Sequence, residues 1–93
     1  MTIKQMQYLD AIFKYKNFTK AAQMLYISQP SISNAITAME NELGFKLLDR
    51  NSKNVSFTPE GNKYMEYVRR VLVAYDQAEA FAKDIISVAC DKY

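Results

Sequence analysis

Residues 18–44 read FTKAAQMLYISQPSISNAITAMENELG, and this stretch decides the fold. Thr19 is a suitable N-cap for a short, alanine-rich helix over residues 20–26, and Ser28 is a suitable N-cap for the longer helix that follows. Small alanine side chains in the first helix allow another helix to approach closely. Because only about two residues separate the two helices, the stretch predicts a helix-turn-helix.

The longer helix has two faces of different chemical character. Pro30 stands in its first turn, where a missing N–H costs nothing, and Gly44 is a stop signal at its end. At about 100° per residue, one arc is apolar and is the predicted core face: Ile32, Ala35, Ile36, Met39 and Leu43. The opposite arc carries short groups without charge: Pro30, Ser33, Asn34, Thr37 and Asn41. A solvated face usually carries Lys and Glu, so this face favours contact with another surface, such as base edges, over a plain polar surface.

Further patterns flank this pair of helices. Thr2 and Gln5 fit a capping box at the start of an N-terminal helix. After the helix-turn-helix the hydrophobic period changes, and residues 47–50 and 55–58 predict two short strands joined by a turn over residues 51–54. A hairpin this short is marginal alone and must pack on the helices.

The sequence that follows predicts one long helix. Thr58-Pro59-Glu60 supplies a cap, a proline for the first turn and an acid, and nothing stops the helix before about Val88. Its roughly thirty residues span about 45 Å, more than the width of so small a domain. Two rows with heptad-like spacing run along its later turns: Val71, Tyr75, Ala78, Phe81, Ala82 and Ile85. The chain has no other elements left to bury these side chains, so we predict that they form a homodimer interface.

Composition narrows the class of protein. The 93 residues contain no histidine and one cysteine, Cys90. This excludes Ser-His-Asp and Cys-His catalysis, His-containing and Cys-cluster zinc sites and an intrachain disulfide, and we expect no cofactor. Residues 1–70 carry ten Lys and Arg against six Asp and Glu, whereas residues 71–93 carry two against four, so the N-terminal part is suited to a polyanion. No stretch reads as a membrane span or secretory signal, so we expect a cytoplasmic protein without a membrane partner.

Five motifs together resemble a known family. FTKAA, SQPSIS, ELG, LLDR and TPEG, at the separations found here, closely resemble the DNA-binding domain of LysR-type transcriptional regulators, and the resemblance covers residues 1–88. It implies a mainly helical fold: a winged helix-turn-helix over residues 1–58 and a linker or dimerisation helix with a C-terminal tail over residues 59–93. The third helix is then expected in the major groove, with the hairpin as a wing at the minor groove. Members of this family carry an effector-binding domain after the linker helix, so we expect this chain to be an N-terminal fragment or a truncated product.

The resemblance also implies which residues meet double-stranded DNA, expected here as a palindromic operator. It maps contacts onto the start of the third helix and onto Lys53 of the wing. With their polar neighbours, the predicted DNA-binding residues are Gln29, Pro30, Ser31, Ser33, Asn34, Thr37, Arg50, Lys53 and Asn54. Asn34 stands where the family often has arginine, which favours adenine over guanine at that contact.

Several charged residues keep alternative interpretations. Lys20, Lys46 and Arg50 either neutralise phosphates or pair locally. The lysines at positions 4, 14 and 16 are interpreted as solvated surface, and the glutamates at 40 and 42 as intramolecular partners of basic groups. The competing prediction for the function is a helical protein-interaction module. For a full-length protein, an oligomer larger than a dimer is a further alternative.

Overall fold

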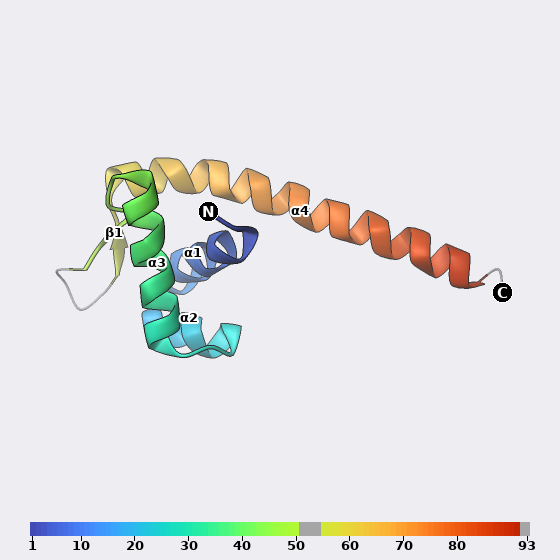
Figure 1. The fold of residues 1–93 in the computed structure, drawn as a ribbon, viewed down its shortest axis with the longest axis horizontal. Coiled ribbons are helices and arrows are strands. Elements are labelled where there is room, and N and C mark those ends of the chain that lie inside the picture. Colours follow the sequence, from blue (N-terminus) through green and yellow to red (C-terminus); the bar gives the residue numbers. More distant parts are fainter. Residues whose placement is uncertain (51–54, 92–93) are drawn as a thin grey trace.

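The computed structural model describes the backbone of residues 1–50 and 55–91 and the side chains of residues 1–50 and 55–86. Within these ranges the order of elements is α1 (Ile3–Tyr15), α2 (Phe18–Leu25), α3 (Gln29–Leu43), β1 (Leu48–Asp49), β2 (Ser56–Phe57) and α4 (Pro59–Asp91). The three shorter helices and the hairpin gather at one end of α4, and the rest of α4 projects away from them (Figure 1). This arrangement confirms the predicted winged helix-turn-helix with a long final helix.

Local hydrogen bonds define where the first and third helices begin and end. The backbone N–H of Gln5 donates to Thr2 Oγ1 at 3.1 Å, and the N–H of Thr2 donates to Gln5 Oε1 at 2.9 Å, which completes the predicted capping box. Ser28 Oγ accepts from the N–H of Ser31 at 3.2 Å. Gly44 closes α3 in the left-handed conformation, with φ of 85°.

The start of α2 differs from the prediction. The helix begins at Phe18, and its N-cap is Asn17, whose Oδ1 accepts from the N–H of Lys20 at 2.9 Å. The predicted cap, Thr19, lies inside the first turn, so that assignment was wrong. Asn and Thr are both good caps, and the tight corner after α1 selects the earlier one because Lys16 already ends α1 in the left-handed conformation.

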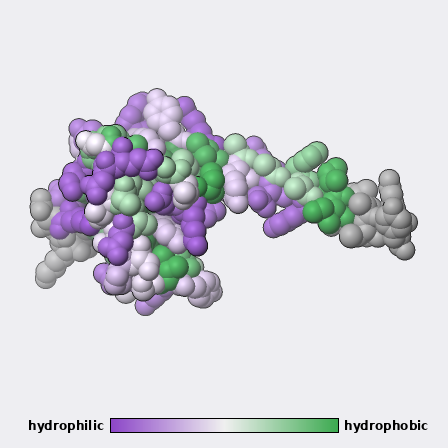
Figure 2. Space-filling view, viewed as in Figure 1, coloured by the Kyte–Doolittle hydropathy of each residue, from purple (hydrophilic) through white to green (hydrophobic). Residues whose placement is uncertain are grey.

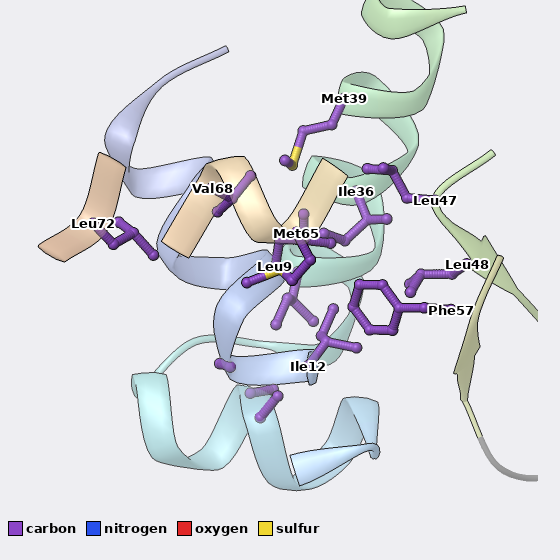
Figure 3. Packing of buried hydrophobic residues seen from close by; sticks show 14 residues of the cluster. Leu9, Ile12, Ile36, Met39, Leu47, Leu48, Phe57, Met65, Val68 and Leu72 are labelled. Carbon is purple, nitrogen blue, oxygen red and sulfur yellow. The ribbon is translucent and has the colours of Figure 1, made fainter. Parts of the chain in front are cut away.

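The core is formed where α1, α2, α3, the hairpin and the start of α4 meet (Figure 3). Its fully buried large side chains are Leu9, Ile12, Ile32, Ile36, Met39, Leu47, Met65 and Val68. The adjacent alanines of α2, Ala21 and Ala22, are also buried, which agrees with the prediction that small residues permit close packing there. The predicted core face of α3 is confirmed at Ile32, Ile36 and Met39, whereas Ala35 and Leu43 are only half-buried.

The strands are shorter than predicted, two residues each, and they pair antiparallel with Leu48 opposite Phe57. Thr58 connects the hairpin to α4: its N–H donates to Leu47 O at 3.0 Å, and its hydroxyl donates to Lys46 O at 2.6 Å. The same hydroxyl oxygen accepts from the N–H of Gly61 at 2.9 Å, so Thr58 caps α4 as predicted. A Cβ on buried Gly61 would collide with the Leu47 carbonyl, so the helix approaches this segment as closely as a backbone can.

The core face of α4 is formed by Met65, Val68 and Leu72, which are buried. Val71, the first of the predicted dimer residues, is exposed. After Leu72 every described side chain of α4 is exposed, and apolar groups gather towards the far end of the arm (Figure 2). Among the described residues, none of the helices combines the length and apolar character needed to cross a membrane.

Candidate nucleic-acid interface

The first turn of α3 is held by its neighbours. Ser28 caps the helix, and its hydroxyl lies 2.7 Å from the Ser31 hydroxyl, so Ser31 is part of the cap. Thr19 Oγ1 of α2 donates to Gln29 Oε1 at 3.2 Å, which ties the first residue of α3 to the first turn of α2. The amide group of Gln29 thereby keeps its two N–H donors for another partner.

The polar face of α3 points away from the core over its first half. Gln29, Pro30, Asn34 and Thr37 are exposed, and Ser33 is half-buried. The Thr37 hydroxyl donates to the carbonyl oxygen of Ser33 at 3.1 Å, so what it offers outward is its methyl group and the remaining acceptor capacity of its oxygen. Asn34 has no such local bond among the described contacts and presents a donor and an acceptor side by side.

A buried carboxylate connects α3 to the hairpin. Glu40 is only 4% exposed, and its Oε2 accepts from the backbone N–H groups of Leu47 at 2.8 Å and Leu48 at 3.2 Å. Its Oε1 lies 3.5 Å from Nη2 of Arg50, which also stacks 5.5 Å from the ring centre of Phe18. The interpretation of Glu40 as an intramolecular partner of a basic group is confirmed; its acceptance of the two amides was missed.

Arg50 therefore forms an ion pair within the chain, but this pair does not occupy all of its hydrogen-bond donors. Its side chain remains 38% exposed, and a guanidinium offers five N–H donors, of which Glu40 can take only part. The structure thus brings Arg50 next to Glu40 and the start of α2, on the side where the hairpin leaves the core. The other predicted wing residues, Lys53 and Asn54, lie outside the described residues.

The predicted dimer residues lie on α4, and all except Val71 come after Leu72, the last core residue of the helix. Val71, Tyr75, Ala78, Phe81, Ala82 and Ile85 are all exposed. Phe81 and Ile85 are 69% and 55% exposed, which is unusual for large apolar side chains. The negative charge of Glu79, one turn away, raises the pKa of the Tyr75 phenol above its ordinary value. A row of this kind is available for a partner.

The chain matches a known protein family over most of its length. The model of the family described as "Bacterial regulatory helix-turn-helix protein, lysR family" matches residues 3–62, which is more than half of the chain. The chain belongs to this LysR family.

Curated relatives extend the match along the chain. The chain is 40% identical over 88 residues to the HTH-type transcriptional regulator BenM of Acinetobacter baylyi, which covers 95% of the chain and 29% of BenM. It is 42% identical over 72 residues to the hydrogen peroxide-inducible genes activator of Haemophilus influenzae, covering 77% of the chain and 24% of that protein. The chain thus spans less than a third of the length of these regulators. The names of both relatives describe regulators of gene expression.

Solved structures of LysR-family proteins share the fold described above. A complex of the BenM DNA-binding domain with catB site 1 DNA superimposes with a TM-score of 0.87 at 39% identity, covering 94% of this chain and 98% of that one. A DNA complex of the CbnR DNA-binding domain gives a TM-score of 0.81 at 30% identity, covering 89% and 95%. These coverages are larger than the share of the chain that the helix-turn-helix and the hairpin make up together. The structural match therefore includes α4 as well as the compact end.

Sequence reasoning missed two features of this interface. One is the hydrogen bond from Thr19 to Gln29, and the other is the hydrogen bond from the Leu47 N–H to buried Glu40. Both depend on contacts between elements. The sequence contains one signal for Glu40. This carboxylate follows Ile36 by one helical turn and stands next to Met39, so it lies on the core side of α3, where a buried charge needs hydrogen-bond donors. Thr19 gave no comparable signal.

Proposed function

We propose that this chain binds double-stranded DNA sequence-specifically and thereby controls transcription, with α3 in the major groove and the hairpin as a wing at the minor groove. The residues proposed to meet DNA are Gln29, Pro30, Ser31, Ser33, Asn34, Thr37, Arg50, Lys53 and Asn54. In this proposal residues 1–58 bind DNA, and residues 59–93 pair two chains. We propose a cytoplasmic location for a regulator that acts on DNA in this way.

The observation that carries this proposal is the exposed, uncharged face of α3, presented by a helix whose other face is locked into the core. Amide and hydroxyl groups on a helix of this size fit the major groove, which is about 12 Å wide, and their donors and acceptors match base edges. The relatives whose DNA complexes are solved have the same fold at 30–39% identity. Within the proposed site, Asn34 supplies the bidentate donor and acceptor that suit adenine.

We also propose that two chains pair through α4. The apolar side chains of α4 after Leu72 are exposed and pack on no other part of the described chain. They lie beyond the compact end of the molecule, so one chain alone cannot bury them. The family resemblance implies antiparallel helices. That orientation brings Phe81 and Ile85 of one chain towards the start of α4 in the other, where Phe45, Tyr64 and Tyr67 line an apolar hollow. Pairing in this way supports a palindromic operator, because a two-fold protein matches a two-fold site.

DNA binding should depend steeply on salt. If a dimer neutralises about six phosphates, the logarithm of the association constant should fall with the logarithm of salt concentration at a slope of about −5. Fluorescence anisotropy of labelled duplexes between roughly 50 and 200 mM salt measures this slope. A protein-interaction module has no such slope, so a flat profile or no binding to any duplex pool rejects the proposed function.

Asn34→Ala should relax base preference at one position of each half-site and should cost about 1–3 kcal/mol there. The variant should stay folded because Asn34 is exposed. Asn41→Ala is the matched control: it is the same change on the same face, seven residues further along α3 and beyond the proposed contacts. Affinities for single-base operator variants provide the readout. Uniform weakening over all sequences would instead make Asn34 a backbone contact.

Ile85→Glu should yield monomers, because a charge on the proposed interface cannot be buried unpaired. Val73→Glu is the control: Val73 is also an exposed β-branched residue, but it lies roughly 145° round the helix from the centre of the row. Sedimentation at tens of micromolar should separate the two variants, and Ile85→Glu should weaken binding to a palindrome far more than binding to a half-site. An unmodified chain that sediments as a monomer contradicts the proposed dimer.

A further inference from the structure

Lys16 has a backbone conformation that lysine rarely adopts. It ends α1 with φ of 57° and ψ of 28°, in the left-handed region, while its N–H donates to Ile12 O at 2.8 Å. Among the described residues only Lys16 and Tyr26 are non-glycine residues with positive φ, whereas α3 uses Gly44 at the equivalent position. Glycine would satisfy this corner without strain, so the presence of a lysine points to a role for its side chain.

The Lys16 ammonium occupies a defined position at the junction of α1 and the hairpin. Its Nζ lies 4.2 Å from the ring centre of Phe13 in α1 and 5.2 Å from that of Phe57 in β2. The two rings pack edge to face at 5.0 Å. Contact with two aromatic faces restricts the long side chain, and an ammonium with three donors can still bind an anion on its other side.

Positive charge accumulates at this junction. The guanidinium of Arg69 in α4 lies 5.1 Å from the same Phe13 ring. Within the described residues, no ion pair involves Lys16 or Arg69. Two cations on one ring repel each other, and an external anion would relieve that repulsion.

The junction lies between the two proposed DNA contacts. On one side, the first turn of α2 is bonded to the first residue of α3 through Thr19 and Gln29. On the other side, Arg50 of the hairpin stacks on Phe18, two residues after Lys16. The corner between α1 and α2 is therefore next to residues of both proposed DNA contacts in the chain.

We propose that Lys16 binds a phosphate of the DNA backbone between the segment contacted by α3 and the segment contacted by the wing. This proposal rests on the proposed function and adds a phosphate contact from the α1–α2 corner to it. The aromatic pair holds the ammonium in place before DNA arrives, so less side-chain freedom is lost on binding. Solvated surface, the interpretation of Lys16 from the sequence, is the alternative to this contact.

The test is Lys16→Gly, which removes the cation and supplies the residue best suited to the left-handed conformation. The melting temperature should not fall, whereas the magnitude of the salt slope should decrease by about 0.9 per bound subunit. Lys16→Asn, which also tolerates this conformation, is a second variant with the same expected loss. Lys16→Arg retains the charge and should retain the wild-type slope.

Lys4→Ala is the matched control, because Lys4 is an exposed lysine about 18 Å away along α1 and should leave the slope unchanged. A wild-type slope for Lys16→Gly or Lys16→Asn, or a reduced slope for Lys16→Arg, overturns the phosphate contact while DNA binding by the domain stands. Absence of salt-dependent binding by the wild-type chain overturns the proposed function and this contact together.

Discussion

The Glu40 carboxylate is the contact on which the relative position of α3 and the hairpin depends. It lies on α3, yet its bonds go to the backbone of the segment that enters β1 and to Arg50 beyond that strand. Loss of the carboxylate would leave two amides without their acceptor, at a cost of roughly 1–3 kcal/mol each if they stay buried. This network fixes the separation between α3 and the hairpin, which the proposed binding of neighbouring grooves requires.

The start of α4 reinforces that arrangement from the opposite side of the hairpin. Thr58 bonds to the carbonyl groups of Lys46 and Leu47, and the absence of a side chain at Gly61 lets α4 lie against the same short segment. Residues 46–48 are thus held between α3 and α4. The hairpin has only two paired residues in each strand, so its position comes from these contacts more than from its own ladder.

Features that depend on neighbours in the sequence were predictable. The capping box of Thr2, the Ser28 cap and the Gly44 stop all follow from hydrogen bonds within one helical turn, and the core face of α3 follows from its period. Features that depend on contacts between elements were not. The heptad-like row on α4 did not reveal that Met65 and Leu72 face the core, because both rows are apolar and only the packing partner selects one. The site was predicted on α3, whereas the role proposed for Lys16 required the positions of the Phe13 and Phe57 rings.

The exposed face of α3 is proposed to read sequence in duplex DNA. Selection of bound sequences from a pool of random duplexes tests this proposal, because it presumes neither the operator nor the effector. We expect enrichment of an inverted repeat with defined bases in each half, as two-fold pairing through α4 requires. A pool that emerges without any enriched motif, although protein was bound and recovered, would contradict it.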